Sequence, residues 1–134
     1  MTAAVSFTWL GMVLAISFLE APLKFRAPGV TLQLGLGIGR VVFRALNLVE
    51  LVMFLLVIAS VVIAPRPALI WSTAALALLL VVQLGIVRPA LNRRSDRVLA
   101  GEAAPRSGAH LVYVGLEVAK AAVLVVSGCM ALSP

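Results

Sequence analysis

Residues 110–128, HLVYVGLEVAKAAVLVVSG, decide the fold, because they are apolar and long enough for a membrane-crossing helix and still contain charged side chains. The polar residues of this stretch follow one another at steps of three, four and three, so they share one helix face: His110, Tyr113, Glu117 and Lys120. An ionisable group near the centre of a bilayer costs about 2.5–3.5 kcal/mol on insertion scales. We therefore expect this stripe to face other protein or water.

The composition of the whole chain agrees with a membrane protein. The 134 residues are 63% hydrophobic and 12% charged, whereas soluble domains contain about 25% charged residues. Four apolar stretches each approach the roughly 20 residues that a helix needs to cross hydrocarbon. We predict an all-α, polytopic membrane protein, one domain over residues 1–134, with four transmembrane helices in a bundle. The helices are expected at about residues 3–21, 30–64, 68–87 and 109–132, and the second combines an amphipathic extension (30–45) with a span (46–64).

The net charge of +6 comes from lysines and arginines that flank the apolar stretches, so it sets membrane topology and does not indicate a nucleic-acid partner. The first and third connections contain nearly all of these residues, and the middle connection contains only Arg66. The positive-inside rule then places both termini outside the cytoplasm and both basic connections inside it. In a bacterium the membrane would be the plasma (inner) membrane.

Polar residues on the other three helices are placed to meet the stripe on the fourth. They cluster at the end of the first helix, the start of the second and the end of the third, in the predicted cytoplasmic half, while the outer half is almost purely aliphatic. We predict a polar pocket that opens inward. Its expected ligand-binding residues are Glu20, Lys24, Arg40, Arg44, Asn47, Glu50, Gln83, Arg88, His110, Tyr113, Glu117 and Lys120.

Two carboxylates have predicted partners. Glu20 and Lys24 are four residues apart, so they can pair if the first helix continues past Pro22. Glu117 is expected to be ionised and paired with Lys120 on its own face, and with Arg40 or Arg44 across the second helix.

Other residues predict packing and helix ends. Gly35 and Gly39 lie opposite the polar face of the second stretch, where such a pair lets another helix or a second protomer approach closely. Trp9 is expected to anchor the first helix at the membrane interface. The tight turn at residues 65–67 and the pair Arg88-Pro89 are expected to separate and close the third helix, and Ser107 is the expected cap of the fourth.

Residues 21–50, APLKFRAPGVTLQLGLGIGRVVFRALNLVE, follow an apolar helix with Trp9-Leu10-Gly11 and resemble the small four-helix membrane proteins related to transmembrane protein 205. The matching features are a Pro-x-x-Phe exit, a Gly-Arg-x-x-Phe helix, a third helix ending in Arg88-Pro89, and a last helix that begins with histidine: Pro22, Phe25, Gly39, Arg40, Phe43 and His110. The resemblance covers most of the chain and carries over no biochemical activity. Its kinship with copper-resistance membrane proteins would imply metal, but this chain has one histidine and no Met-rich or Cys-paired site.

Cations outnumber carboxylates around the predicted pocket, which favours an anionic small molecule or a lipid headgroup as ligand. The chain would then be a carrier or an accessory subunit, with membrane lipids, a larger membrane assembly or a second copy as partners. Two alternatives stay open. One is an intramembrane enzyme with His110 as general acid or base, oriented by Glu117 or Glu20; the other is a structural protein whose ion pairs fix helix register. No cofactor or metal is expected, because the cations oppose a metal ion and Cys129 is alone.

Overall fold

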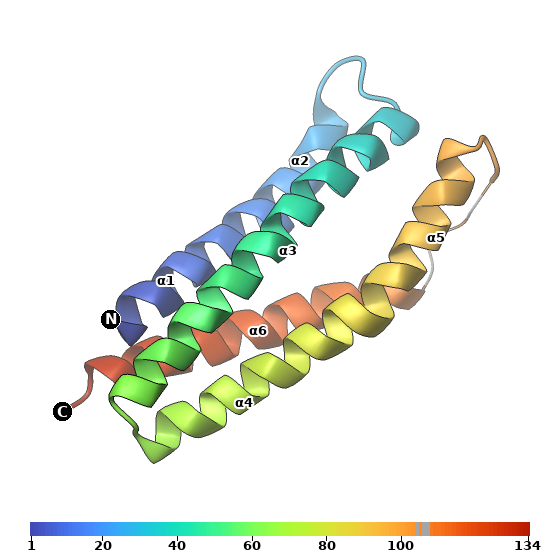
Figure 1. Ribbon diagram of the computed structural model, residues 1–134. Coiled ribbons are helices and arrows are strands. Elements are labelled where there is room, and N and C mark those ends of the chain that lie inside the picture. Colours follow the sequence, from blue (N-terminus) through green and yellow to red (C-terminus); the bar gives the residue numbers. More distant parts are fainter. Residues whose placement is uncertain (104, 106–107) are drawn as a thin grey trace.

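The computed structural model describes residues 1–103, 105 and 108–134. All regular secondary structure in these residues is helical, and they contain no strand (Figure 1). Four helical stretches are each long and apolar enough to cross a membrane: Thr2–Arg26, Leu32–Ile63, Pro67–Leu99 and Gly108–Leu132. The predicted all-α class with four candidate membrane spans is therefore confirmed.

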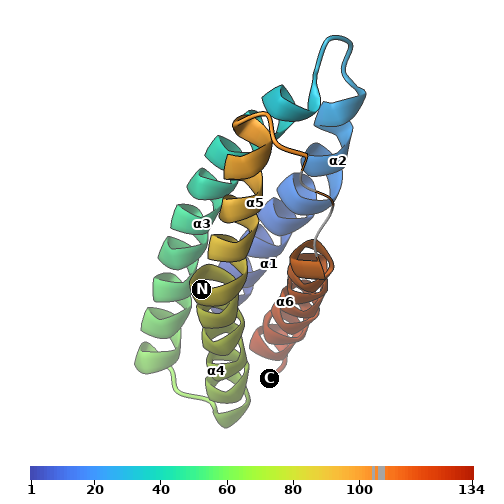
Figure 2. The same ribbon diagram turned by 90° about the vertical axis from the view of Figure 1, so that its right-hand side faces the viewer.

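Two of the four stretches are interrupted by π-helical segments. The first stretch consists of α1 (Thr2–Val13), a π segment (Leu14–Glu20), α2 (Ala21–Leu23) and a 3₁₀ turn (Lys24–Arg26). The third consists of α4 (Pro67–Val82), a π segment (Gln83–Val87) and α5 (Arg88–Leu99). The second and fourth stretches are the single helices α3 (Leu32–Ile63) and α6 (Gly108–Leu132). Both termini and the α3–α4 turn lie at one end of the bundle, and the other two connections lie at the opposite end (Figures 1 and 2).

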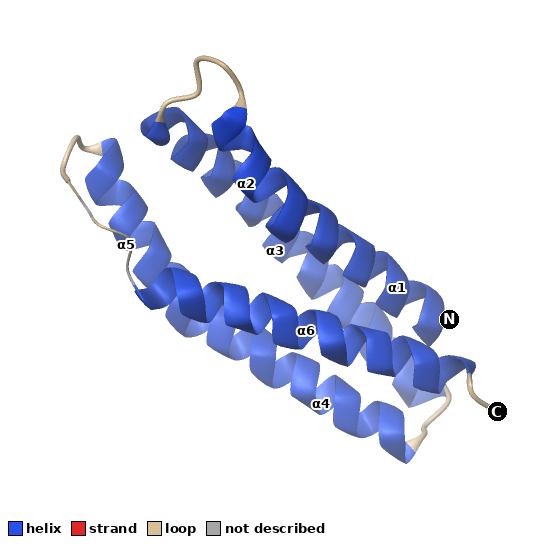
Figure 3. Cartoon of the chain, turned by 180° about the vertical axis from the view of Figure 1, so that it is seen from behind, coloured by secondary structure: helices blue, strands red, loops and turns tan. Residues whose placement is uncertain are grey.

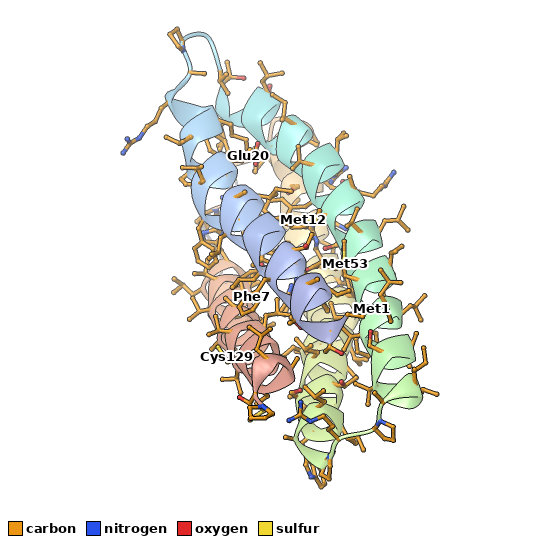
Figure 4. All side chains as sticks on the ribbon, turned by 90° about the vertical axis from the view of Figure 1, so that its left-hand side faces the viewer. Met1, Phe7, Met12, Glu20, Met53 and Cys129 are labelled. Atoms are coloured by element: carbon orange, nitrogen blue, oxygen red, sulfur yellow. The ribbon has the colours of Figure 1, made fainter. Side chains whose placement is uncertain are left out.

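The end that holds the termini, the termini end, is tightly packed. Its core contains residues from all four stretches: Trp9, Val13, Val57, Val61, Leu69, Leu76, Leu80 and Leu124. Phe7 of α1 lies on the side that faces α6 (Figure 4), and a Cβ atom on Gly128 would come within 2.6 Å of Phe7 Cζ. Arg66 Nη1 in the α3–α4 turn donates a hydrogen bond to Met130 O at 3.0 Å, which ties the turn to the end of α6.

The outer surface of the bundle is apolar. Large aliphatic side chains such as Val62 (74% exposed), Ile63 (76%) and Leu78 (65%) point away from the core. A soluble protein rarely exposes so much contiguous apolar surface, whereas lipid chains would cover it. Trp71 is also exposed, close to the α3–α4 turn, where an interfacial tryptophan is expected. The anchor predicted at Trp9 was wrong, because Trp9 is completely buried.

The third helix was predicted to end at Arg88-Pro89, but in the structure it continues to Leu99. A proline inside an α-helix lacks an N–H group, and its ring clashes with the carbonyl four residues earlier. The π segment Gln83–Val87 ends two residues before Pro89 and changes the hydrogen-bond register there. Pro22 follows Leu14–Glu20 in the same way, so the first helix also runs past its proline. The predicted cap Ser107 lies outside the described residues.

The second stretch is one uninterrupted helix, as predicted for about residues 30–64, so the amphipathic extension and the span are continuous. Its 32 residues span about 48 Å at 1.5 Å per residue, and Thr31 Oγ1 caps its start by accepting from Leu34 N at 3.2 Å. The polar face of its first half packs against α5. Gln33 Nε2 donates to Val98 O at 3.3 Å, and α5 lies beside this half of α3 in Figure 2. The continuation of the third helix therefore supplies the partner of the amphipathic extension.

Gly35 and Gly39 of the second stretch contact the end of the first helix in the same chain. A Cβ atom on Gly35 would lie 2.2 Å from Phe25 Cε1, and one on Gly39 would lie 2.9 Å from Lys24 Nζ. The predicted close approach is therefore present within one chain.

Candidate functional site

Glu117 is the centre of a polar cluster inside the bundle. Its Oε1 accepts from Lys120 Nζ at 2.9 Å and from Gln83 Nε2 at 2.6 Å. Its Oε2 accepts from Ser17 Oγ at 2.9 Å. The Glu117 residue is 1% exposed, so protein groups have replaced the water that would otherwise solvate this carboxylate.

Glu50 on α3 shares the same lysine. Its Oε1 accepts from Lys120 Nζ and, at 3.1 Å, from Trp9 Nε1. All three side chains are fully buried. We call the six linked residues the buried network: Trp9, Ser17, Glu50, Gln83, Glu117 and Lys120. It joins all four helical stretches, because each contributes at least one member.

The two π segments each supply one member of the buried network. Ser17 lies in Leu14–Glu20 and Gln83 lies in Gln83–Val87, and both donate to Glu117. A π turn bends a helix and re-aims its side chains, and such turns are frequent at functional sites. The prolines that require the π turns and the hydrogen bonds to Glu117 therefore occur at the same two places in the chain.

Beyond the network, the helices separate. The start of α6 lies far from α2, whereas α1 and the end of α6 meet; the three ribbon views agree on this (Figures 1, 2 and 3). A cavity of about 460 Å³ lies between the end of the first stretch (residues 17–25), α3, α5 and α6. Part of its wall is apolar, including Phe18, Leu36 and Val114. The polar and charged residues of its wall are Ser17, Lys24, Arg40, Arg88, Asn92, Arg94, Ser95, His110, Tyr113 and Glu117.

A second cavity of about 300 Å³ lies between α3 and α5. Its wall is mostly polar and basic: Arg40, Arg44, Asn47, Leu84, Arg88, Asn92 and Asp96. Arg40 and Arg88 line both cavities. We call the two together the basic cavities.

Arg88 is held by aromatic rings and not by a carboxylate. Its Cζ lies 4.8 Å from the centre of the Phe43 ring and 5.6 Å from that of Tyr113. These two rings meet edge to face, with centroids 5.6 Å apart. Within the described residues Arg88 makes no salt bridge, and its buried Nε has no hydrogen-bond partner. Lys24 Nζ lies 5.5 Å from the same Phe43 ring, so two cations contact one aromatic side chain.

The partners predicted for Glu117 were right for one side chain and wrong for two. Lys120 pairs with it, but Arg40 pairs with Asp96 of α5 and Arg44 is exposed. The physical reason is depth: both arginines lie nearer the start of α3 than Glu50, at the level of α5. The predicted pair of Glu20 and Lys24 is confirmed, with 3.3 Å between Oε2 and Nζ.

The twelve predicted site residues fall into two groups in place of one pocket. Four belong to the buried network: Glu50, Gln83, Glu117 and Lys120. The basic cavities are lined by Lys24, Arg40, Arg44, Asn47, Arg88, His110 and Tyr113, and also by Glu117, which therefore connects the two groups. Glu20 lines neither cavity and neutralises Lys24.

His110 is exposed and makes no hydrogen bond to a described residue. Both oxygens of Glu117 are engaged by other groups, and Glu20 pairs with Lys24, so neither carboxylate orients the histidine. In the part of the chain that the structure describes, no three His, Cys, Asp or Glu residues gather where they could hold a metal ion. The pair of His110 with Glu117 or Glu20 that the enzyme alternative requires is therefore not formed among the described residues.

Three important residues were not among the predicted ligand-binding residues. Trp9 and Ser17 belong to the buried network, and Phe43 is the aromatic contact of two cations. Ser17 could have been predicted from the sequence, because its spacing places it on the same helix face as Glu20 and Lys24. For Trp9 there was none, because hydropathy alone does not distinguish a tryptophan at the interface from one in a core.

Comparisons with protein-family models, with curated proteins and with solved structures found no match to this chain. The resemblance to proteins related to transmembrane protein 205 stays a prediction.

Proposed function

We propose that this chain is a multi-pass membrane protein that binds an anionic membrane lipid, with the phosphate headgroup at Arg88 and part of an acyl chain along the apolar wall of the larger cavity. The single observation that carries the proposal is Arg88. A guanidinium that lines two cavities and has no carboxylate partner among the described residues is free to accept an anion. Arginine presents a planar fork of donors that matches phosphate oxygens.

The surroundings of Arg88 favour a lipid over a free anion. Phe18 and Val114 line the larger cavity from two different helices, and both are partly exposed at the apolar outer surface (38% and 37%). An acyl chain can therefore enter sideways from the bilayer. Basic pockets between membrane helices on the cytoplasmic side suit phospholipid headgroups. By the positive-inside rule the basic connections beside these cavities are cytoplasmic.

The orientation has its own test. Cysteines at Ala103 and Ala68, in a Cys129→Ala background, should react with a membrane-impermeant reagent from opposite sides of the membrane. Both positions are exposed: Ala103 lies in the connection before α6, and Ala68 is the second residue of α4, at the opposite end of the bundle. Reaction of both from the same side would contradict the proposed topology.

Native mass spectrometry tests the lipid site. The protein is extracted in a mild detergent from membranes that contain phosphatidylglycerol and phosphatidylethanolamine. The bound lipids are identified from the masses of the protein–lipid complexes. Wild type should retain phosphatidylglycerol, and Arg88→Gln should lose most of it. Arg66→Gln, at the termini end, is the matched control and should retain it. Equal retention by both variants would contradict the site at Arg88.

A structural role alone is the second candidate, and the buried network favours it. Ion pairs that link four helices fix helix register without any ligand. Under this alternative no variant changes the bound lipid, and only thermal stability responds.

A further inference from the structure

The charges inside the buried network do not balance when both acids are ionised. Lys120 Nζ contacts both Glu50 and Glu117, so one ammonium group serves two carboxylates. All three residues are 0–1% exposed. An uncompensated charge at such a depth is expensive, and a buried acid neutralises when it can take up a proton.

The hydrogen bonds show which carboxyl group is solvated as an anion. Glu117 accepts three hydrogen bonds over its two oxygens, from Lys120, Gln83 and Ser17. Glu50 accepts two, from Lys120 and Trp9, and both reach Oε1. Its Oε2 is buried and has no hydrogen-bond partner. An anion distributes its charge over both oxygens, so Glu50 is much the poorer site for one.

The whole network is short of donors. Two of its polar atoms are buried without a partner, and both are acceptors: Glu50 Oε2 and Gln83 Oε1. One added proton would turn a bare acceptor into a donor and would also remove the excess negative charge. Of the two bare acceptors only Glu50 Oε2 belongs to an acid, so the proton that removes the excess charge is placed on the carboxyl oxygen that no donor serves.

Among the described residues, no second cation forms a salt bridge with Glu50 or Glu117. The charged and titratable groups near Glu50 are Lys120, Glu117 and Tyr113 on α6 and Arg88 on α5. The first helix contributes only Trp9 and Ser17 to the network, and the π segment of the third contributes Gln83. Arg88 stacks on Phe43 and forms no salt bridge with either acid.

We propose that the buried network is a proton-binding site, with one proton held on Oε2 of Glu50 at neutral pH. Ionisable groups enclosed by membrane helices are the elements from which proton relays are built. The proposal is independent of the lipid site, because it concerns a different atom and a different ligand.

Infrared spectroscopy in lipid bilayers tests whether the proton is present. The chain has only five acidic side chains, and surface carboxyl groups are ionised at neutral pH. Wild type should show the carbonyl stretch of one protonated carboxylic acid, shifted by ¹³C-labelled glutamate. Glu50→Gln and Glu117→Gln should each lose the band, because either leaves one carboxylate for one ammonium group. Glu20→Gln and Glu102→Gln should keep it. Absence of the band in wild type would overturn the proposal.

Thermal melting tests where the proton resides. Glu50→Gln replaces a neutral acid with a neutral amide and places its NH₂ group where no donor points, so it should melt within a few degrees of wild type. Glu117→Gln removes the well-solvated carboxylate and moves the negative charge to Glu50, whose Oε2 is buried without a donor, so it should melt at a much lower temperature. Equal destabilisation by the two changes, or failure of Glu50→Gln to fold, would overturn the assignment to Glu50. The wild-type infrared band would still report whether a proton is bound.

Discussion

The two ends of the bundle use the same four helical stretches but are packed by different residues. At the termini end, aliphatic side chains and Trp9 fill the core, and Phe7 packs directly against Gly128. At the other end, which we call the open end, the helices separate around the basic cavities, which are lined by arginines, a lysine and aromatic rings. The buried network lies between these regions. The comparison teaches that π segments beside two prolines allow one end of a helix bundle to be closed while the other stays open.

The largest effect is expected at the boundary between the two ends. Lys120→Met leaves two buried carboxyl groups without their shared cation, and breaking a buried pair typically costs about 3–5 kcal/mol. The melting temperature of the purified protein should therefore fall sharply. The control is Lys24→Met, whose pair with Glu20 is partly exposed and should be worth at most about 1 kcal/mol. Similar melting of the two variants would mean that the network does not hold the helices together.

The second-largest effect on stability is expected at the termini end. Gly128→Ala places a Cβ atom within 2.6 Å of the Phe7 ring, and overpacking of this kind costs about 1–3 kcal/mol. The matched control is Gly115→Ala in the same helix, where a Cβ atom meets nothing within 4 Å. There, the better helix propensity of alanine should keep stability or raise it by about 1 kcal/mol. Thermal melts compare the pair. Equal melting would show that α1 and α6 are not in tight contact.

A smaller effect is expected for the same kind of change at the open end. In Gly35→Ala the new Cβ atom would lie 2.2 Å from Phe25 Cε1, a shorter distance than at Gly128. The two rings are similarly exposed (Phe25 41%, Phe7 39%), but Phe25 lies in the short 3₁₀ turn Lys24–Arg26, whereas Phe7 lies within α1, which packs along α6. We therefore expect the Phe25 ring to rotate away at a cost of about 0.5–1.5 kcal/mol. Gly37→Ala is the control, since a Cβ atom there has open space. If Gly35→Ala is as destabilising as Gly128→Ala, the open end is as rigid as the termini end.

Hydropathy was sufficient to predict the four helices because each span is a continuous apolar stretch. The end of the third helix was not predictable in this way. Pro89 normally terminates a helix, and the π segment that accommodates it leaves no mark in the apolar pattern. The polar helix α5 was therefore expected to be a loop, and the amphipathic half of α3 had no visible partner.

The site was predictable only within single helices. The spacing of Glu117 and Lys120 places them on one face, and the structure pairs them. Which groups on other helices reach Glu117 depends on relative depth and on helix bends. Arg40 or Arg44 was the predicted partner across helices, yet Gln83 and Ser17 occupy that position. Charge complementarity alone does not encode this depth.

The central claim is that the open end holds an anionic lipid at Arg88, and a crystal structure grown from a lipidic phase with a brominated phosphatidylglycerol tests it most directly. The anomalous signal of bromine locates the acyl chain without assumptions about the density. We expect a bromine peak in the larger cavity beside Phe18, Leu36 or Val114, with the headgroup against Arg88. The same crystals of Arg88→Gln should lack that peak. Bromine found only around the outer surface, with both cavities empty of lipid, would contradict the account.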